Sequence, residues 1–526
     1  MVLLFLSVLK MKVLNNPETI QNYLSDESHY FQANLKEVKA IYYPEFEEEV
    51  KKLIEEFNKK RCLCTISGAG TSITGTRVPM YGGVVISTEK VLKVLPLEKF
   101  KEINFSTLLG EVTIYLDQEN LEAYLPAGIS LSVLSEVLPP NLFYPPDPTE
   151  KSALIGATVA TNASGGRSFY YGSTRKWVEG INLVLANGDF LRLNRGEVLA
   201  FNDLFNFKSQ SGESYSFKIP SYHLPKTKNA AGLYTKKNMD LIDLFIGSEG
   251  ILGVITQVKV KLSSKKRDFI GDISFFNLEE EALSYVDKLR AVKDKGILSI
   301  EYFDCNSLNF IKEKFQEIKS SYQAGVFTEI YQDDETMTLL SEILESSNVQ
   351  DDWLADNEHE ISKQKSFRHA LPEGINSYLK QHQSYKLGTD FVVEVREFPE
   401  MMKFYQEIGE RFKSRFPRDG FHYVLFGHIG DCHLHFNFIT HTSQELEVAK
   451  ELYLEMALKA NYLGGTISGE HGVGKKMVRK NDHDIPYLQL MYGQEGIREI
   501  ARIKKVFDSH WILNVGNMIP REVNLI

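Results

Sequence analysis

Residues 67–75 read Ser67-Gly68-Ala69-Gly70-Thr71-Ser72-Ile73-Thr74-Gly75, and the elements predicted around them indicate the fold of the amino-terminal half. Apolar residues at helical spacing predict a helix over residues 44–60, which leads into a strand over residues 62–66. The next predicted strand covers residues 83–87. The glycine-rich stretch therefore joins two strands, whereas a Rossmann loop runs directly into a helix and a Walker loop ends in Gly-Lys-Ser/Thr.

The chemistry of this loop suits an anion. Its glycines allow backbone amides to converge on one point, and Thr71, Ser72 and Thr74 add hydroxyl donors. We therefore interpret the loop as a pyrophosphate cradle. A glycine-rich turn without a ligand is the commoner explanation for such a stretch taken alone.

Two further regions are rich in small residues. Residues 145–172 begin with a stiff proline segment and continue through Ile155-Gly156-Ala157-Thr158-Val159-Ala160-Thr161-Asn162-Ala163-Ser164-Gly165-Gly166. Residues 244–256 have the pattern of a turn between sheet elements and pass into an alternating strand over residues 258–262. A tight turn explains each region alone, but two small-residue regions within one domain favour a large ligand with phosphates and a ring system.

Two histidine segments near the end of the chain indicate a reaction centre. Residues 427–437 read Gly-His-Ile-Gly-Asp-Cys-His-Leu-His-Phe-Asn, and residues 468–475 read Ser-Gly-Glu-His-Gly-Val-Gly-Lys. His433, His435 and Asn437 alternate along an apolar run, so a strand would place them on one face. Two imidazoles and Glu470 would suit a divalent metal with an open coordination position, and His471 could remain free as a base. The alternative is a set of satisfied polar groups within a sheet.

Composition excludes several classes of protein. The 526 residues carry a net charge of -10 without a basic run, which argues against nucleic-acid binding. The four cysteines form neither a disulfide framework nor an iron–sulfur pattern, so we expect a reducing compartment and an external electron partner if the protein is a redox enzyme.

Residues 1–10 are apolar but too short to cross a bilayer, and they lack the features of a signal peptide. We expect a cytoplasmic protein whose membrane contact, if any, is peripheral, at the inner face.

Together, the three small-residue regions resemble the FAD-binding domain of the vanillyl-alcohol-oxidase-like, PCMH-type flavoproteins. The two histidine segments resemble the branch of D-lactate, glycolate and D-2-hydroxyglutarate dehydrogenases. The resemblance extends from about Lys36 to the carboxyl end. It implies an α+β fold, with a PCMH-type FAD-binding domain of two α+β subdomains over residues 30–265. It also implies an α+β cap domain over residues 266–480 and a helical segment over residues 481–526 that returns to the flavin.

The resemblance also assigns a set of residues to FAD. The pyrophosphate would be held by Ser67, Gly68, Ala69, Gly70, Thr71 and Ser72. The dinucleotide and the flavin ring would be lined by Pro146, Asp147, Asn162, Ala163, Gly165, Tyr171 and Gly172. The remaining contacts would come from Glu249, Gly250, Gly253, Ile255 and Asn514. Because residues 67–76 contain neither His nor Cys, we expect the FAD to be bound non-covalently.

In the cap, the resemblance assigns the metal, which we expect to be zinc, to His428, His435 and Glu470. It assigns the catalytic base to His471, a substrate-side position to Asn437 and the substrate carboxylate to Arg368, with Lys386 as a looser match. The spacing from Lys386 to Asp390 is longer than in the family, and both could be solvated charges. Relatives commonly read Gly-Asp-Gly-Asn where this chain has Gly430-Asp431-Cys432-His433, so His433 could be a pocket wall, a partner of a ligand or an alternative ligand.

The implied reaction is the oxidation of a D-2-hydroxy acid to a 2-oxo acid, with hydride passing to flavin N5. Substrates of the lactate, glycolate and 2-hydroxyglutarate type are compatible, as are a quinone, a cytochrome or an electron-transfer flavoprotein as acceptor and a homodimeric state. The alternatives are a flavin enzyme acting on a sugar or lactone, and a metal-dependent hydrolase. Residues 194–237 are long and polar, which indicates a flexible surface loop or, alternatively, a lid or docking element.

Overall fold

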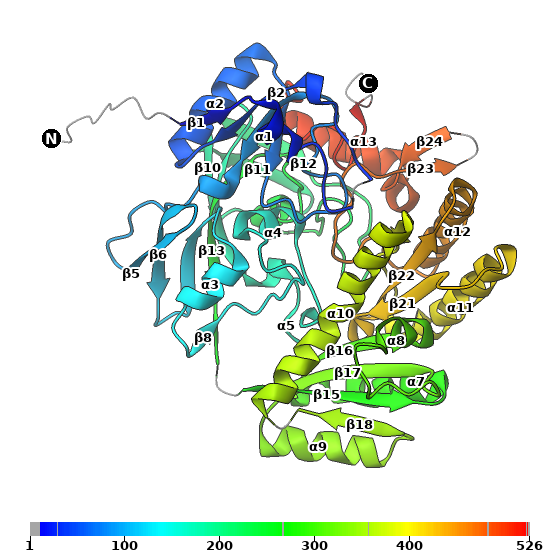
Figure 1. The fold of residues 1–526 in the computed structure, drawn as a ribbon. Helices are drawn as coiled ribbons and strands as arrows, with labels where there is room; N and C mark the ends of the chain where they lie inside the picture. Colours follow the sequence, from blue (N-terminus) through cyan, green and yellow to red (C-terminus); the bar gives the residue numbers. More distant parts are fainter. Residues whose placement is uncertain are drawn as a thin grey trace.

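The computed structural model describes residues 11–28, 30–265, 268–355, 357–480, 483–521 and 523, so the apolar segment 1–10 lies outside the described residues. The fold mixes helices and strands, and the predicted α+β class is confirmed. Two sheet-containing parts lie side by side, one coloured blue to cyan and the other green to orange (Figure 1). The predicted domain limits stay predictions.

The glycine-rich loop belongs to a small sheet with the strand order β1-β2-β4-β3, in which β2, β4 and β3 run parallel. These strands are β1 (Lys12–Leu14), β2 (Val38–Tyr43), β3 (Cys64–Ser67) and β4 (Gly83–Ser87). The predicted helix is α2 (Glu47–Lys60), which begins at Glu47 because Phe46 still has extended backbone. It buries the apolar residues that predicted it, Val50, Leu53, Ile54 and Phe57. The loop joins β3 to β4, as expected.

The second sheet is antiparallel, with the strand order β10-β9-β13-β7-β6-β5. Its strands are β5 (Lys101–Thr107), β6 (Gly110–Asp117), β7 (Glu122–Pro126), β9 (Val178–Val184), β10 (Phe190–Asn194) and β13 (Val254–Lys261). Helix α4 (Ile155–Thr161) packs on β13 and β7. A Cβ on Gly156 would lie 2.6 Å from the Cβ of Ala127, so the small residues of this region allow the helix to approach the end of β7.

The later part of the chain is built on a larger sheet with the strand order β18-β15-β17-β16-β21-β22-β19, and β20 (Phe391–Val392) also pairs with β22. Its strands are β15 (Phe269–Phe276), β16 (Ile297–Asp304), β17 (Ala324–Tyr331), β18 (Asp351–Leu354), β19 (Tyr385–Gly388), β21 (Tyr423–Gly427) and β22 (His433–Thr440). One face packs against α8 (Cys305–Ile311) and α10 (Glu358–His382). The other packs against α7 (Glu279–Ala291), α9 (Asp334–Glu345), α11 (Phe398–Arg415) and α12 (Ser443–Tyr462).

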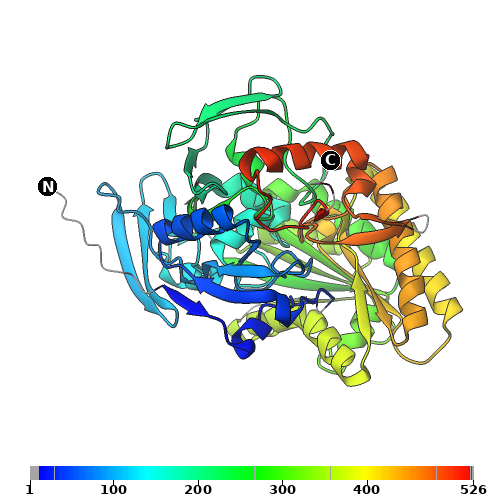
Figure 2. The same cartoon turned by 90° about the horizontal axis from the view of Figure 1, so that it is seen from above.

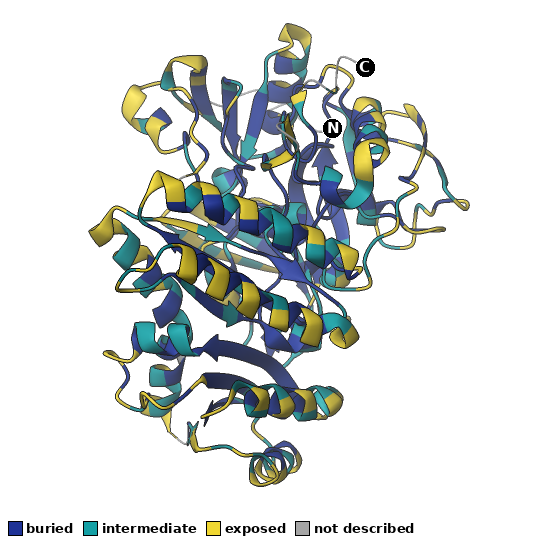
Figure 3. Ribbon diagram, turned by 90° about the vertical axis from the view of Figure 1, so that its right-hand side faces the viewer, coloured by how far each residue is buried: buried dark blue, intermediate teal, exposed yellow. Residues whose placement is uncertain are grey.

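Burial follows the faces of these elements. The helices of this part turn buried residues toward the sheet and exposed residues toward solvent (Figure 3). On β22, His433, His435 and Asn437 share a face with Ile439, which packs in the cluster formed with α8 and α10. The predicted histidine strand is therefore confirmed, and its polar residues lie on the same side of the sheet as α10.

The end of the chain returns to the first sheet after α13 (Gln489–Phe507), the red helix that lies beside the amino-terminal part (Figure 2). The amide of Cys64 donates to the carbonyl of Ile512 at 2.7 Å, and the amide of Asn514 donates to the carbonyl of Cys64 at 2.9 Å. Residues 194–237 contain a hairpin, β11 (Leu204–Lys208) and β12 (Ser214–Lys218), which the sequence did not predict. Tyr215 of this hairpin stacks on Phe507, with ring centroids 5.5 Å apart. Among the described residues, no helix has the length and apolar character required to cross a bilayer.

Candidate active site

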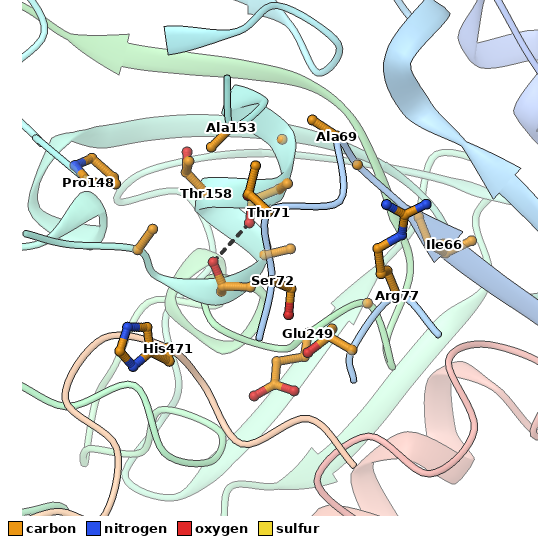
Figure 4. Close-up of a pocket in the computed structure, with 18 of the residues that line it drawn as sticks. Ile66, Ala69, Thr71, Ser72, Arg77, Pro148, Ala153, Thr158, Glu249 and His471 are labelled. Atoms are coloured by element: carbon orange, nitrogen blue, oxygen red, sulfur yellow. Dashed lines mark hydrogen bonds between the residues drawn. The ribbon is translucent and has the colours of Figure 1, made fainter. Parts of the chain in front are cut away.

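One cavity of ≈ 310 Å³ brings together the regions singled out in the sequence. Its walls come from the loop after β3, from α4, from the segment before β13 and from the second histidine segment. Ala69, Thr71 and Ser72 border the same space as the imidazole of His471 (Figure 4). The lining includes eleven of the predicted FAD residues: Gly68, Ala69, Gly70, Thr71, Ser72, Ala163, Glu249, Gly250, Gly253, Ile255 and Asn514.

The loop has the shape and charge expected of a pyrophosphate cradle. Gly70 has a φ of 93°, and a Cβ at this position would overlap the guanidinium of Arg77. Arg77 also lines the cavity, and its buried Nε has no hydrogen-bond partner among the described residues. Gly70 therefore leaves space beside the loop backbone, and Arg77 Nε provides a positively charged donor without a partner among those residues. Both features fit a bound diphosphate. Arg77 could not be assigned to the site from the sequence, because an isolated arginine after a glycine-rich loop belongs to no recognisable pattern.

Replacing Gly70 by Ala is expected to lower FAD affinity by at least about 10-fold, since the new methyl group would displace the Arg77 guanidinium. The control is Gly196→Ala, where φ is 87° and a Cβ would meet no atom within 4 Å. Both variants carry a backbone cost of about 1–2 kcal/mol, but only the first alters the cradle. The measurement is the FAD retained by purified protein and released into the supernatant by acid. Equal FAD content in the two variants would contradict the cradle, and colour left in the pellet would contradict non-covalent binding.

The remaining predicted FAD residues lie outside this lining. Ser67 ends β3, and its hydroxyl donates to the carbonyl of Gly68 at 3.0 Å. Asn162 ends α4 in the left-handed region and accepts from the amide of Arg175 at 3.0 Å. The other five are Pro146, Asp147, Gly165, Tyr171 and Gly172. Within the described residues, the Tyr171 hydroxyl pairs with that of Tyr331 at 2.8 Å, and Asp147 joins an arginine network.

Glu249 and Asn514 connect the FAD side of the cavity to the second histidine segment. Asn514 accepts from the amide of Ile66 at 2.6 Å and donates to the carbonyl of Glu249 at 2.8 Å. The Glu249 carboxylate accepts from the amides of Val473 and Gly474, at 2.6 and 2.7 Å. Burial raises the pKa of Glu249 to about 7, although these amides oppose the shift. The segment that carries His471 is thereby fixed to the cavity wall.

The predicted metal residues lie together. Glu470 Oε1 is 3.4 Å from His428 Nε2 and 3.4 Å from His435 Nε2. His433 joins them, with its Nδ1 3.9 Å from Glu470 Oε2, and one potential ligand atom from each of the four residues lies within 4.8 Å of the others. Imidazole nitrogens and a carboxylate oxygen are the donors that zinc and similar divalent ions take in proteins, so this cluster fits a metal.

Charges around the cluster control its protonation. Burial alone would raise the pKa of Glu470, but Lys228, 2.8 Å away, and His428 hold it well below its usual value. Burial would lower the pKa of His428, but the Glu301 carboxylate and Glu470 raise it to about 9. Burial and the Lys228 ammonium lower the pKa of His433 to about 3, which leaves that imidazole neutral. The cluster therefore contains a carboxylate and a neutral imidazole, both available as ligands.

Asp390 organises the second histidine segment. Its side chain is 1% exposed, and its Oδ2 accepts from the Ser468 hydroxyl at 2.6 Å and from the His471 amide at 3.0 Å. The same oxygen lies 3.2 Å from His471 Nδ1, so the opposite ring nitrogen, Nε2, is left to face the cavity side. The possibility that Asp390 is a solvated charge is wrong, because buried donors surround it. Lys386 is exposed on β19, opposite Ile439.

Arg368 and Asn437 also lie beside the cluster. Arg368 Nη2 is 3.3 Å from Glu301 Oε1, and Arg368 Nη1 is 3.6 Å from Asp147 Oδ2. Glu301 in turn accepts from His428 Nδ1 at 2.8 Å, so it links the arginine to the histidines. Asn437 is buried on β22, two residues after His435. Neither Glu301 nor Lys228 could be assigned to the histidine cluster from the sequence, because no spacing rule connects them to it.

Comparisons with known proteins match two families to this chain. Residues 38–194 match the family described as FAD binding domain, and residues 273–518 match the C-terminal domain of FAD linked oxidases. The chain is 29% identical over 498 residues to glycolate oxidase subunit GlcD of Bacillus subtilis, covering 92% of this chain and 89% of that protein. It is 27% identical over 495 residues to D-lactate dehydrogenase of Anaerostipes hadrus, covering 90% and 87%.

Two further matches extend the comparison. The chain is 26% identical over 524 residues to D-2-hydroxyglutarate dehydrogenase of Xanthomonas citri pv. viticola, covering 97% of this chain and 94% of that protein. The solved structure of an alkyldihydroxyacetonephosphate synthase superposes with a TM-score of 0.65 at 14% identity, covering 97% of this chain and 82% of that one. The latter match supports the fold alone.

Proposed function

This chain belongs to the FAD-linked oxidoreductases of the glycolate, D-lactate and D-2-hydroxyglutarate dehydrogenase family, and we propose that it oxidises a D-2-hydroxy acid to the 2-oxo acid. One observation carries the proposal. The cavity lined by the glycine-rich loop is also lined by Glu470 and His471 of the second histidine segment. A flavin held by the first part and a hydroxy acid held by the second would therefore share one space.

The cofactors would be held by residues already described. The loop residues 68–72 with Arg77 would hold the FAD diphosphate, and His428, His435 and Glu470 would hold a divalent metal, for which zinc is our first candidate. When bound, FAD accepts a hydride and the metal lowers the pKa of an alcohol.

The residues of this chain would perform the binding and proton transfer. Arg368 would pair with the substrate carboxylate, because a planar guanidinium matches it with two parallel hydrogen bonds. His471 would take the hydroxyl proton on Nε2, since its Nδ1 faces Asp390 at 3.2 Å. Loss of that proton and of a hydride from the same carbinol group leaves a carbonyl, so the two-electron oxidation balances. Asn437 and Lys386 lie on neighbouring strands of this face as further substrate-side candidates.

The reduced flavin would then pass its electrons to an external acceptor such as a quinone, a cytochrome or an electron-transfer flavoprotein. The four cysteines of the sequence do not have the spacing of iron–sulfur ligands, so the sequence does not indicate a second redox centre of that type. A metal-dependent hydrolase would use the histidine cluster but would leave the FAD-binding part without a role.

Anaerobic titration with D- and L-2-hydroxy acids tests the proposal. We expect a D acid to bleach the flavin absorption, its L enantiomer to be much slower, and prior chelation to suppress bleaching without releasing FAD. Both enantiomers of lactate and of 2-hydroxyglutarate form the panel with achiral glycolate, and glucose and a lactone are the controls. Bleaching by the sugar or lactone alone would overturn the substrate class, and full bleaching after proven metal removal would overturn the metal assignment.

A further inference from the structure

His433 occupies a position in β22 at which its imidazole could be a wall of the pocket or a ligand. We infer that it is a fourth protein ligand, so that the metal is held by His428, His433, His435 and Glu470. This inference rests on the proposed function, because it assumes that the cluster holds a metal. It extends the ligand set beyond the two histidines and one glutamate that the resemblance implies.

The first observation is an unsatisfied nitrogen. The side chain of His433 is 0% exposed, and its Nδ1 has no hydrogen-bond partner in the part of the chain that the structure describes. A buried polar atom without a partner is costly unless something outside the protein satisfies it. This nitrogen faces Glu470 at 3.9 Å, too far for a hydrogen bond. A cation bound by this nitrogen and by Glu470 would supply the missing partner.

The second observation is that the three imidazoles have the same arrangement. His428 Nδ1 donates to the Glu301 carboxylate at 2.8 Å, and His435 Nδ1 lies 3.2 Å from the carbonyl of Thr389. His433 Nε2 donates to Asp390 Oδ1 at 2.7 Å. In each ring the nitrogen held by an oxygen is the one remote from Glu470, and the opposite nitrogen faces Glu470.

This arrangement is typical of metal-binding histidines, whose second nitrogen is usually held by a carboxylate or a carbonyl. The held nitrogen carries the proton, which leaves the lone pair of the other nitrogen for the metal. His433 satisfies this requirement as fully as the two predicted ligands do. The Gly469 backbone lies against its ring, since a Cβ there would be 3.0 Å from His433 Cε1, and the ring is therefore fixed in place.

A competing ligand group contains Asp390, His435, Glu470 and His471, which also bring potential ligand atoms within 4.8 Å. The oxygens of Asp390 are already occupied, Oδ1 by His433 and Oδ2 by the Ser468 hydroxyl and the His471 amide. His471 lines the cavity with Glu470 and is the base of the proposed reaction. Both groups share Glu470, whose Oε2 accepts from Lys228 at 2.8 Å. The group that contains His433 leaves the contacts of Asp390 intact, so we prefer it.

Four protein ligands have a consequence for the substrate. A catalytic metal must keep a coordination position open for the substrate. With four protein ligands this is possible only if the ion becomes five- or six-coordinate. The site should therefore bind its metal more tightly than a site with three protein ligands, and it should accept ions that take five or six ligands.

The test compares zinc binding by wild-type holoenzyme, His433→Asn and His441→Asn. His441 is a matched control, because it too buries a ring nitrogen without a partner among the described residues, but it belongs to no ligand group. Each protein is stripped by chelation, reloaded with Zn²⁺ and titrated with a competing chelator. We expect the Kd of His433→Asn to rise at least about 10-fold and that of His441→Asn to stay at the wild-type value. Zinc-edge X-ray absorption should count three imidazoles in the wild type and two in His433→Asn.

An unchanged Kd and two imidazoles in the wild type would overturn the inference and leave the proposed function standing. Failure of the wild type to bind any divalent ion would overturn both. FAD content verifies that each variant is folded. If His433→Asn does not fold, the imidazole count of the wild-type protein decides alone.

Discussion

Replacing His471 by Asn is expected to slow flavin reduction by about 10²- to 10⁴-fold while FAD remains bound. Asn cannot take the hydroxyl proton, but its size and polarity suit a position beside Asp390 and Glu470. The loop around residue 471 does not depend on the imidazole for its position, because the amides of Val473 and Gly474 donate to Glu249. The fold should therefore survive and the chemical step should fail.

Stopped-flow reduction under anaerobic conditions measures this step directly. His441→Asn is the control, since it makes the same substitution at a histidine outside the ligand groups. Metal and FAD contents of both proteins should equal those of the wild type. Reduction of His471→Asn at the wild-type rate would show that another group takes the proton, and loss of its metal would move His471 into the ligand set.

Much of the fold could be predicted because its signals are local. The helix α2 follows from four apolar residues at helical spacing, and the β3–β4 loop follows from glycines between two apolar runs. The shared face of His433, His435 and Asn437 follows from the period of two in a strand. The hairpin β11–β12 was missed because its strands are short and lie in a polar segment, and its burial depends on α13, nearly 300 residues later.

The site was only partly predictable, because its supporting charges come from distant segments. Glu301 lies in β16, whose residues are all buried, and Lys228 follows the β11–β12 hairpin. No spacing rule connects them to His428 or Glu470, so only the folded chain shows the ion pairs. The sequence leaves Asp390 open as a solvated charge for the same reason, since none of its partners is nearby in the sequence.

Asp390→Asn is expected to have the largest effect of any single change at the site. The carboxylate accepts from His433 Nε2, from the Ser468 hydroxyl and from the His471 amide, and every partner is a donor. The side-chain amide of Asn would point its NH₂ group at the donors on one side of the residue. Water cannot reach this position to separate the two donors. Removing one partner of a buried charged network costs about 3–5 kcal/mol. For a domain of the size of the predicted cap domain, residues 266–480, this loss of stability corresponds to a fall in Tm of about 6–20 °C.

The same change should slow flavin reduction by no more than the about 10²- to 10⁴-fold expected for His471→Asn, because it acts on the base by removing the acceptor that fixes the His471 tautomer. Thermal unfolding and anaerobic reduction measure the two effects, and Asp352→Asn, at an exposed position on β18, should leave both at wild-type values. A variant that melts early but reduces flavin normally when cold would make Asp390 a structural residue only. Slow reduction with normal metal content would instead show that Asp390 acts on the base. We expect slow reduction together with weaker metal binding, because one oxygen of Asp390 holds His433 and the other lies 3.2 Å from Nδ1 of His471.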